Sequence, residues 1–266
     1  MCPNCRAFVT TADKVCPYCD IQLGARAAER RTPADVMGGL IPHARFTTVV
    51  ILLINAGIYV AGEIPGMREG FNGVTIFEAG AKYGPAISAG QWWRLITAGF
   101  LHGGLLHLLM NSWVLFDLGS STEENYGTSR YLVFYFISTI TGFLASLYWS
   151  PVIPSVGSSA GIFGLLGAMV AFGVRDKSSY GAAVRNHYMQ WAIYAVVLSA
   201  LMSQTDNAAH VGGFSGGFAI AYAAGTPRYR GVMEQVWRGA AGVSLAVTAA
   251  AFFFMVRWLL MANRTF

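Results

Sequence analysis

The chain has 266 residues, of which 55% are hydrophobic and only 12% are charged, and its mean hydropathy is +0.47. This composition is too apolar for a soluble domain and predicts a polytopic membrane protein, which excludes the soluble α/β-hydrolases. The formal net charge of +5 comes from basic residues clustered between apolar segments, so no nucleic-acid partner is expected.

All four cysteines lie near the start, as the pairs Cys2–Cys5 and Cys16–Cys19. Two CxxC pairs at this spacing suit a tetrahedral Zn²⁺ site with four thiolate ligands and no open position for catalysis. Two disulfides or a thioredoxin-like redox pair are the alternatives, but the cytosol disfavours disulfides and no βαβ context is present. We therefore predict a structural zinc ribbon over residues 1–22 that is stabilised by its metal and could dock a cytosolic partner or position the protein.

A basic linker at the membrane surface is predicted over residues 23–45. Seven apolar spans follow, judged against the roughly 20 residues that cross a bilayer. Six lie in a core over residues 46–225, and the seventh follows a cytosolic loop in residues 226–266. The second, fourth and fifth are short for full crossings, which suggests that water enters the bundle from one side. The predicted spans are Phe46–Gly62, Gly103–Leu118, Tyr131–Tyr148, Ser159–Gly173, Tyr188–Met202, Ala208–Ala224 and Ala240–Met261.

The basic residues predict how these spans are oriented. With the N-terminus inside, thirteen of the 18 lysines and arginines fall on the cytosolic side. The positive-inside rule thus predicts a cytosolic N-terminus and an external C-terminus. Because no signal or transit peptide is recognisable, we expect the prokaryotic cell (inner) membrane. The long external segment Glu63–Trp93 is expected to lie partly in the interface, anchored by Trp92 and Trp93.

A serine stands at the start of the fourth span, where Gly157, Ser159 and Gly161 form a GxSxG pattern. In soluble hydrolases this pattern presents a nucleophile after a strand, but no alternating strand precedes it here. The predicted topology puts Ser159 and His210 at the outer ends of their helices. Histidine can take a proton from serine near neutral pH, so we predict a Ser159–His210 dyad that needs no catalytic cofactor.

Small residues accompany both members of the dyad. Gly213 and Gly217 share a helical face with His210, and the fourth span carries a matching row that includes Ala160 and Gly164. Such rows let helix backbones approach closely. They also serve ordinary helix packing, and a membrane histidine can equally belong to a proton relay.

The second span offers donors for a developing negative charge. His107 and Asn111 are four residues apart and so share one helical face. They can serve as oxyanion donors, and an interhelical hydrogen-bond clamp is the alternative. Asp206, four residues before His210, could orient the imidazole as a third member, although we expect it to lie in the outer loop.

Taken together and in order, these motifs resemble the rhomboid family of intramembrane serine proteases over nearly all of residues 46–225. The resemblance implies an all-α membrane protein, with a rhomboid-like six-helix bundle plus one extra C-terminal transmembrane helix after the zinc ribbon. It implies a Ser159 nucleophile, a His210 base, and an oxyanion site from His107, Asn111 and the N–H of Ser159. The motifs are Trp93-Arg94, His102 with His107 and Asn111, Gly119 with Glu123 and Gly127, Gly157-Ser158-Ser159-Ala160-Gly161, and Ala209-His210 with Gly213 and Gly217.

Two positions depart from the family pattern. The residue after the serine is Ala160 instead of glycine, and the aromatic residue four positions after it is Phe163, which can stack on His210 but lacks a hydroxyl. Neither change removes a reacting group, so activity is still expected. Arg94 is expected to stabilise the external loop, and Glu123 to accept structural hydrogen bonds near the cytosolic end.

The predicted function is an intramembrane endopeptidase that cleaves single-span membrane proteins at or near the outer boundary of the lipid bilayer. We expect a small residue before the cut and helix-breaking residues after it. A catalytically inactive rhomboid-like scaffold or escort protein is the rival, although it has no need of all four candidate side chains. A transporter with a histidine proton relay is a further rival, but neither a repeat of the spans nor a chain of acidic residues supports it.

Overall fold

The computed structural model describes residues 15–21, 46–64, 75–201, 205–225 and 232–261. The chain divides into two units, Met1–Pro42 and His43–Phe266. In the first unit, the described residues form a tight turn in which the N–H of Cys16 donates to the Ile21 carbonyl at 2.9 Å. The N–H of Asp20 donates to the Cys16 carbonyl, also at 2.9 Å. The predicted linker over residues 23–45 lies outside the described residues.

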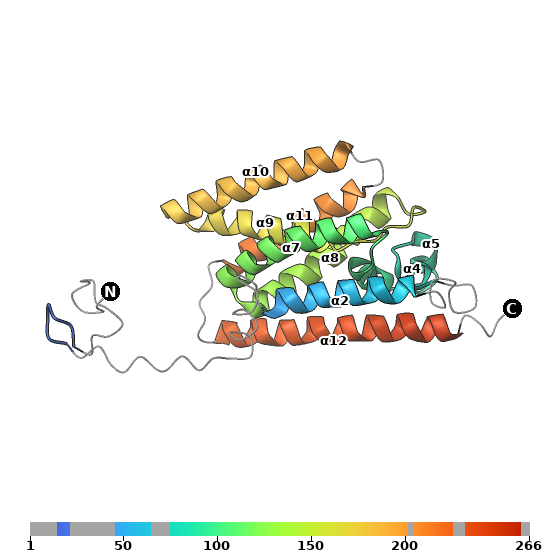
Figure 1. Cartoon of the computed structure of the whole chain (residues 1–266), viewed down its shortest axis with the longest axis horizontal. Coiled ribbons are helices and arrows are strands. Elements are labelled where there is room, and N and C mark those ends of the chain that lie inside the picture. The colour runs from blue at the N-terminus through green and yellow to red at the C-terminus, as the bar shows by residue number, and fades with distance from the viewer. Residues whose placement is uncertain (1–14, 22–45, 65–74, 202–204, 226–231, 262–266) are drawn as a thin grey trace. The chain divides into compact units, whose positions relative to one another are not determined.

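The described part of the second unit is helical, apart from an isolated antiparallel bridge between Lys82 and Ser155. Each predicted span corresponds to one long helix (Figure 1). The long helices are α2 (Phe46–Glu63), α7 (Leu105–Tyr126), α8 (Thr128–Trp149), α9 (Ser159–Arg175), α10 (Ser179–Leu201), α11 (Asn207–Ala224) and α12 (Val232–Met261). Between α2 and α7 lie the short helices α4 (Ile76–Gly80), α5 (Gly84–Ser88) and α6 (Arg94–Thr97) and the 3₁₀ helix η1 (Ala98–Phe100).

Several of these helices have the length and composition of membrane spans. Among the described residues, α2, α8 and α12 are each long and apolar enough to cross a membrane. The segment Arg94–Phe100 and α7 meet at an angle of 89° and together meet the same test as a broken span. α9 is apolar but has only 17 residues.

The second, fifth and seventh predicted spans form longer helices than hydropathy alone predicts. α7 continues to Tyr126 instead of ending near Leu118, α10 begins at Ser179 instead of near Tyr188, and α12 begins at Val232 instead of near Ala240. A helix requires only its backbone hydrogen bonds, so it can continue into polar sequence beyond the apolar stretch. Of the three helices expected to be short, α9 alone is shorter than 18 residues.

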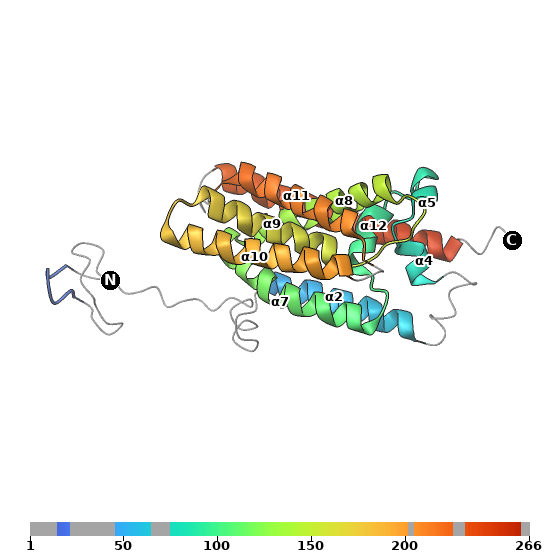
Figure 2. The ribbon, with the colours of Figure 1, turned by 90° about the horizontal axis from the view of Figure 1, so that it is seen from above.

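α9 is the central helix of the bundle and packs against α7, α8, α10 and α11. Every residue from Ala160 to Gly173 is buried, as expected for a helix that is apolar on all sides. Figure 1 shows α10 and α12 on opposite sides of α9. Figure 2 shows α2 beside α7, against which it packs.

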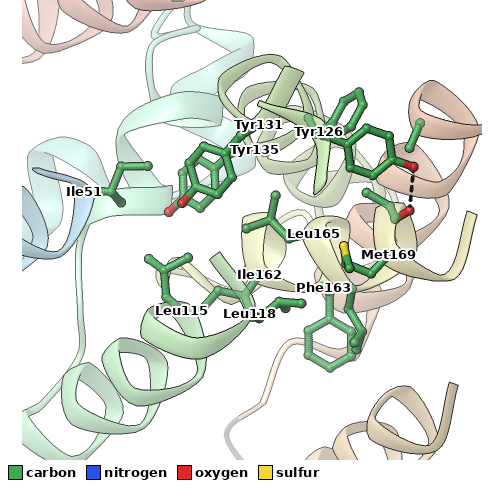
Figure 3. Close-up of a cluster of buried hydrophobic side chains, with 14 of the residues drawn as sticks. Ile51, Leu115, Leu118, Tyr126, Tyr131, Tyr135, Ile162, Phe163, Leu165 and Met169 are labelled. Atoms are coloured by element: carbon green, nitrogen blue, oxygen red, sulfur yellow. Dashed lines mark hydrogen bonds between the residues drawn. The ribbon is translucent and has the colours of Figure 1, made fainter. Parts of the chain in front are cut away.

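Large apolar side chains fill the space between α9 and its neighbours. Figure 3 shows Leu165 of α9 near Tyr131 of α8, with Leu115 of α7 on another side. The hydroxyl of Tyr126 donates to the Ala168 carbonyl at 3.1 Å. This bond pairs a hydroxyl that would otherwise be buried without a partner.

Glu123 joins three helices near the C-terminal end of α7. Its Oε2 accepts hydrogen bonds from the N–H and the hydroxyl of Thr48, both at 3.3 Å, and its Oε1 accepts from the Thr128 hydroxyl at 2.8 Å. Thr48 lies in the first turn of α2, where the backbone N–H groups have no partner within the helix. The carboxylate therefore caps α2 and binds the start of α8.

Candidate active site

Ser159 and His210 come together at the N-terminal ends of two neighbouring helices. Ser159 is the first residue of α9, and His210 lies in the first turn of α11. The Oγ of Ser159 lies 3.0 Å from the Nε2 of His210. Phe163, one turn further along α9, stacks on the imidazole with ring centroids 4.1 Å apart and planes at 10°. The hydrogen bond and the stacked ring together define the orientation of the imidazole.

The two helices approach this closely because glycines face backbone atoms. A Cβ placed on Gly213 would lie 2.1 Å from the carbonyl oxygen of Ala160. A Cβ on Gly217 would lie 2.0 Å from the carbonyl oxygen of Gly164. No side chain fits at such distances, so the two rows of small residues noted in the sequence form the α9–α11 contact.

Gly157 brings His107 next to the serine. Its φ of 134° lies in the region that favours glycine, and its N–H donates to the Ala98 carbonyl at 2.9 Å. A Cβ at Gly157 would lie 2.8 Å from the His107 Nε2 and 3.5 Å from the Ser159 Oγ. Both side chains therefore border the same glycine, and only a glycine leaves the space between them open.

A cleft of about 1960 Å³ opens beside the serine and is bordered by α7 and α10. Its lining includes Ser159, His210, His107 and Asn111. The Nδ2 of Asn111 is buried and has no hydrogen-bond partner within the described ranges. Buried polar groups in native structures usually have a hydrogen-bond partner, so this amide is a donor that a group bound in the cleft could use.

His102 lies next to Ser158 and His107. Its Nε2 is 3.3 Å from the hydroxyl of Ser158, and its ring meets that of His107 edge to face at 5.2 Å. His102 is 7% exposed. It contacts the neighbours of Ser159 and can thereby hold His107 and the start of α9 in place.

Arg94 makes several contacts within the segment between α2 and α7. Its Nη1 donates to the carbonyls of Glu78 and Ala81, at 2.6 and 2.8 Å, and its Nε donates to the Gln91 side chain at 2.7 Å. The guanidinium is 5.5 Å from the centre of the Trp258 ring of α12. These contacts tie α4 and α6 to α12.

Trp93 occupies a different position from the one predicted. It is only 7% exposed, and its Nε1 donates to the Ala79 carbonyl at 3.3 Å. Its ring stacks on that of Phe254 of α12, with ring centroids 6.3 Å apart. Trp93 is therefore a packing residue and not an interfacial anchor. Trp92, which is 39% exposed, remains accessible. The difference arises because Arg94 fastens this segment against α12.

Asp206 does not contact the imidazole of His210. Its Oδ1 accepts a hydrogen bond from the N–H of Ala209 at 3.0 Å, and its Oδ2 accepts one from the Ser146 hydroxyl. The Nδ1 of His210 is buried and has no hydrogen-bond partner among the residues that the structure describes. Asp206 therefore acts as the N-cap of α11 and not as a third member of the dyad.

The sequence interpretation did not single out Lys82. Its side chain is completely buried, and its Nζ donates to the carbonyls of Ser150 and Ile153 at 2.9 and 2.7 Å. A lysine within the glycine-rich stretch GAKYG was the available signal, since buried lysines require polar partners.

The predicted zinc ligands are described only in part. Cys16 is buried, and Cys19 is half-buried on the same turn. Cys2 and Cys5 lie outside the described residues, so a four-cysteine cluster could not appear within residues 15–21. Two thiols three residues apart on one turn fit half of a tetrahedral thiolate set. The zinc ribbon stays a prediction.

The sequence profile of the Rhomboid domain matches residues 89–227, more than half of the chain. The chain belongs to the rhomboid family. It is thus an all-helical, multi-pass membrane protein homologous to the rhomboid serine proteases, and its rhomboid domain contains Ser159, His210, His107 and Asn111.

The relatives include proteins named as proteases and one named inactive. Rhomboid protease GluP of Bacillus subtilis is 34% identical over 82% of this chain and 42% of its own length. Rhomboid-like protease 3 of Toxoplasma gondii is 37% identical over 55% of this chain and 57% of its own. Inactive RHOMBOID-like protein 8 of Arabidopsis thaliana is 35% identical over 46% of this chain and 35% of its own. The chain thus spans about half the length of these curated relatives.

Proposed function

We propose that this rhomboid is an active intramembrane serine endopeptidase that cleaves transmembrane segments of single-span membrane proteins. The observation that carries the proposal is the 3.0 Å distance between the Ser159 Oγ and the His210 Nε2, at the edge of a large cleft. This distance is within the range that a general base needs to take a proton from a nucleophile.

The proposed reaction uses the Ser159 hydroxyl as the nucleophile and the His210 imidazole first as a base and then as an acid. The Oγ of Ser159 attacks the scissile carbonyl carbon while its proton passes to the Nε2 of His210. The protonated imidazole then gives that proton to the leaving amine nitrogen as the peptide C–N bond breaks, which leaves an ester on Ser159. A water molecule, deprotonated by His210, hydrolyses the ester and restores the serine.

The oxyanion formed in each attack needs donors already in place. Ser159 begins α9, so its backbone N–H has no acceptor within the helix. The Nδ2 of Asn111 supplies a second donor from the cleft lining, and the ring of His107 borders the same space. We propose that these three groups form the oxyanion site.

Both departures from the family pattern are compatible with activity. Ala160 is completely buried, and a Cβ on Gly142 of α8 would lie 2.7 Å from its methyl carbon. The methyl group therefore packs against α8, away from the cleft. Phe163 keeps the stacking contact with His210, so the missing hydroxyl does not remove the support of the imidazole.

A substrate helix would reach Ser159 through the cleft between α7 and α10. The lining includes exposed apolar side chains on both helices, such as Trp113 and Leu198. The scissile carbonyl must leave its helical hydrogen bond to meet the serine. Helix-breaking residues after the cut and a small residue before it should therefore favour cleavage.

We also propose the topology and the domain organisation. All seven long helices cross the bilayer as a core of six plus α12, with the N-terminus in the cytosol and the C-terminus outside. The excess of basic residues in the predicted cytosolic segments supports this orientation. The four cysteines of residues 1–22 would hold one structural Zn²⁺ through their thiolates, and this ribbon would bind a cytosolic partner.

A labelled fluorophosphonate probe tests the proposed dyad. Purified full-length protein in detergent is treated with the probe, and wild type is compared with Ser159→Ala, His210→Ala and the control Ser244→Ala on α12. Labelling of wild type and the control, with none in the other two variants, is expected. If the folded wild type remains unlabelled and cuts no transmembrane substrate, the dyad is not catalytic.

An inactive scaffold is the alternative function, favoured by the similarity to a relative named inactive. The same assay separates the two functions, since a scaffold would leave the probe unreacted.

The zinc ribbon is tested by measuring metal in the purified full chain. About one zinc per chain is expected for a site of four cysteine thiolates, and its loss in Cys16→Ser; wild type without zinc would contradict the ribbon.

A further inference from the structure

The orientation of His210 depends on where α11 begins. Its Nδ1 has no hydrogen-bond partner in the described part of the chain, while its Nε2 faces Ser159 and its ring stacks on Phe163. No carboxylate of the described residues therefore holds the far side of the ring, unlike the arrangement in a three-membered triad. Besides these two contacts, the backbone of the first turn of α11 sets the position of the imidazole.

Asp206 determines that first turn. Its carboxylate accepts from the N–H of Ala209 at 3.0 Å, and its carbonyl accepts from the N–H of His210 at 3.2 Å. The other carboxylate oxygen accepts from the hydroxyl of Ser146, in the last turn of α8. One residue thus caps α11, binds the backbone of His210 and attaches both to α8.

Lys82 fastens the segment that leads into the nucleophile. Its amino group donates to two carbonyls, those of Ser150 and Ile153, just after α8 ends. Its backbone N–H and carbonyl pair with the carbonyl and N–H of Ser155, at 2.9 and 3.0 Å. Ser155 stands four residues before Ser159, so the lysine holds both ends of a short loop between α8 and α9.

The two side chains also interact electrostatically. Burial lowers the pKa of Lys82, and the negative charge of Asp206 opposes this effect. Burial alone would raise the pKa of Asp206. Interactions with the Ser146 and Ser155 hydroxyls and the Ala209 N–H, together with the charge of Lys82, outweigh burial and lower that pKa below its ordinary value. The carboxylate is therefore ionised at neutral pH.

We propose that Asp206 and Lys82 are positioning residues, which together hold the start of α11 and the loop before α9 so that His210 and Ser159 stay within hydrogen-bond distance. The proposal rests on the proposed protease function, because it assigns a role in bringing the dyad together. Neither residue touches the reacting atoms. The external segment that contains Lys82 thereby becomes part of the support of the active site.

The first test measures the rate at which a fluorophosphonate labels Ser159, per folded molecule. Asp206→Ala should label at least about fivefold more slowly than wild type, because a lost N-cap lets the first turn of α11 fray. Asp206→Asn, which can still cap, should recover most of the rate. Lys82→Met should also label more slowly. The matched controls Asp176→Ala and Lys177→Met, at the other end of α9, should label like wild type.

A second measurement does not depend on activity. Hydrogen–deuterium exchange should become faster in residues 205–212 of Asp206→Ala and in residues 150–157 of Lys82→Met, with little change elsewhere. If wild type is unlabelled, the protease function fails while exchange still tests the positioning role. Wild-type labelling rates and exchange in the folded Asp206→Ala and Lys82→Met variants would overturn the proposal, and so would equal loss in Asp206→Asn and Asp206→Ala.

Discussion

Replacing Gly217 with alanine should separate the two helices that carry the proposed dyad. The added Cβ would lie 2.0 Å from the carbonyl oxygen of Gly164, whereas ordinary van der Waals contact begins at 3.4 Å. The obstructing atom belongs to a backbone, so no side chain can rotate out of the way. The α9–α11 contact must therefore open by about 1.4 Å, or the helices must slide.

Two effects should follow from this displacement. Overpacking of this kind usually costs about 1–3 kcal/mol of stability. Because Ser159 lies on α9 and His210 on α11, a shift of about 1 Å between these helices should also slow the chemistry by as much as about a hundredfold. The melting temperature and the fluorophosphonate labelling rate per folded molecule measure the two effects separately.

Gly242→Ala provides the matched control. A Cβ at Gly242, within α12, would meet no atom within 4 Å. Alanine is the better helix former by about 0.5–1 kcal/mol, so this variant should be as stable as wild type or more so, with an unchanged labelling rate. If Gly217→Ala matches wild type in both measurements, close glycine packing does not position the dyad.

Three further predictions concern other contacts. Phe163→Ala, which removes the ring stacked on His210, should slow labelling about tenfold, while Phe163→Tyr should keep the wild-type rate. An alanine variant that labels at the wild-type rate would show that stacking does not position His210. Glu234→Gln leaves Arg130, only 2% exposed, without its 2.8 Å ion-pair partner and should cost about 3–5 kcal/mol in chemical denaturation, whereas the double variant Arg130→Met with Glu234→Leu should recover much of that loss. Because folding lowers the pKa of Asp206 below its ordinary value of 3.8, its charge stabilises the fold above that pH, and this stabilisation is lost in acid. The melting temperature of Asp206→Asn should therefore fall less than that of wild type between about pH 5 and about pH 3. An equal fall in melting temperature for both proteins would contradict this.

Hydropathy predicted where the long helices lie, because a bilayer-spanning helix must be apolar for most of its length. It could not predict where α7 ends or where α10 begins, since both helices continue through polar sequence. It also could not say that α9 is enclosed on all sides. Apolar sequence looks the same whether lipid or protein covers it, and only the glycines and alanines of α9 indicated close neighbours.

The meeting of Ser159 and His210 followed from topology, which put both at the same end of the bundle. Their 3.0 Å distance required the structure, because it depends on the backbone contacts of Gly213 and Gly217. Asp206 illustrates a further limit. Its place four residues before the histidine was compatible with a third catalytic member, and only the contacts with Ala209 and Ser146 show that it caps the helix instead.

The long-range contacts of the segment between α2 and α7 could not be predicted from the sequence. Trp93 has the amphipathic character of an interfacial anchor, yet it packs on Phe254, which lies more than 150 residues away in the chain. Lys82 has the charged side chain that is typical of a solvated loop residue, yet it is fully buried and donates to carbonyls of another loop. Neither placement follows from a local pattern, because both partners come from distant parts of the chain.

Cleavage of a single-span membrane protein in liposomes, with the cut site located by mass spectrometry, tests the central claim most directly. Wild-type protein should cut the substrate once, within the outer part of its transmembrane segment, and Ser159→Ala at the same protein concentration should leave it intact. A folded wild-type protein that cuts no transmembrane substrate, or a cut that persists in Ser159→Ala, would contradict intramembrane proteolysis by this serine.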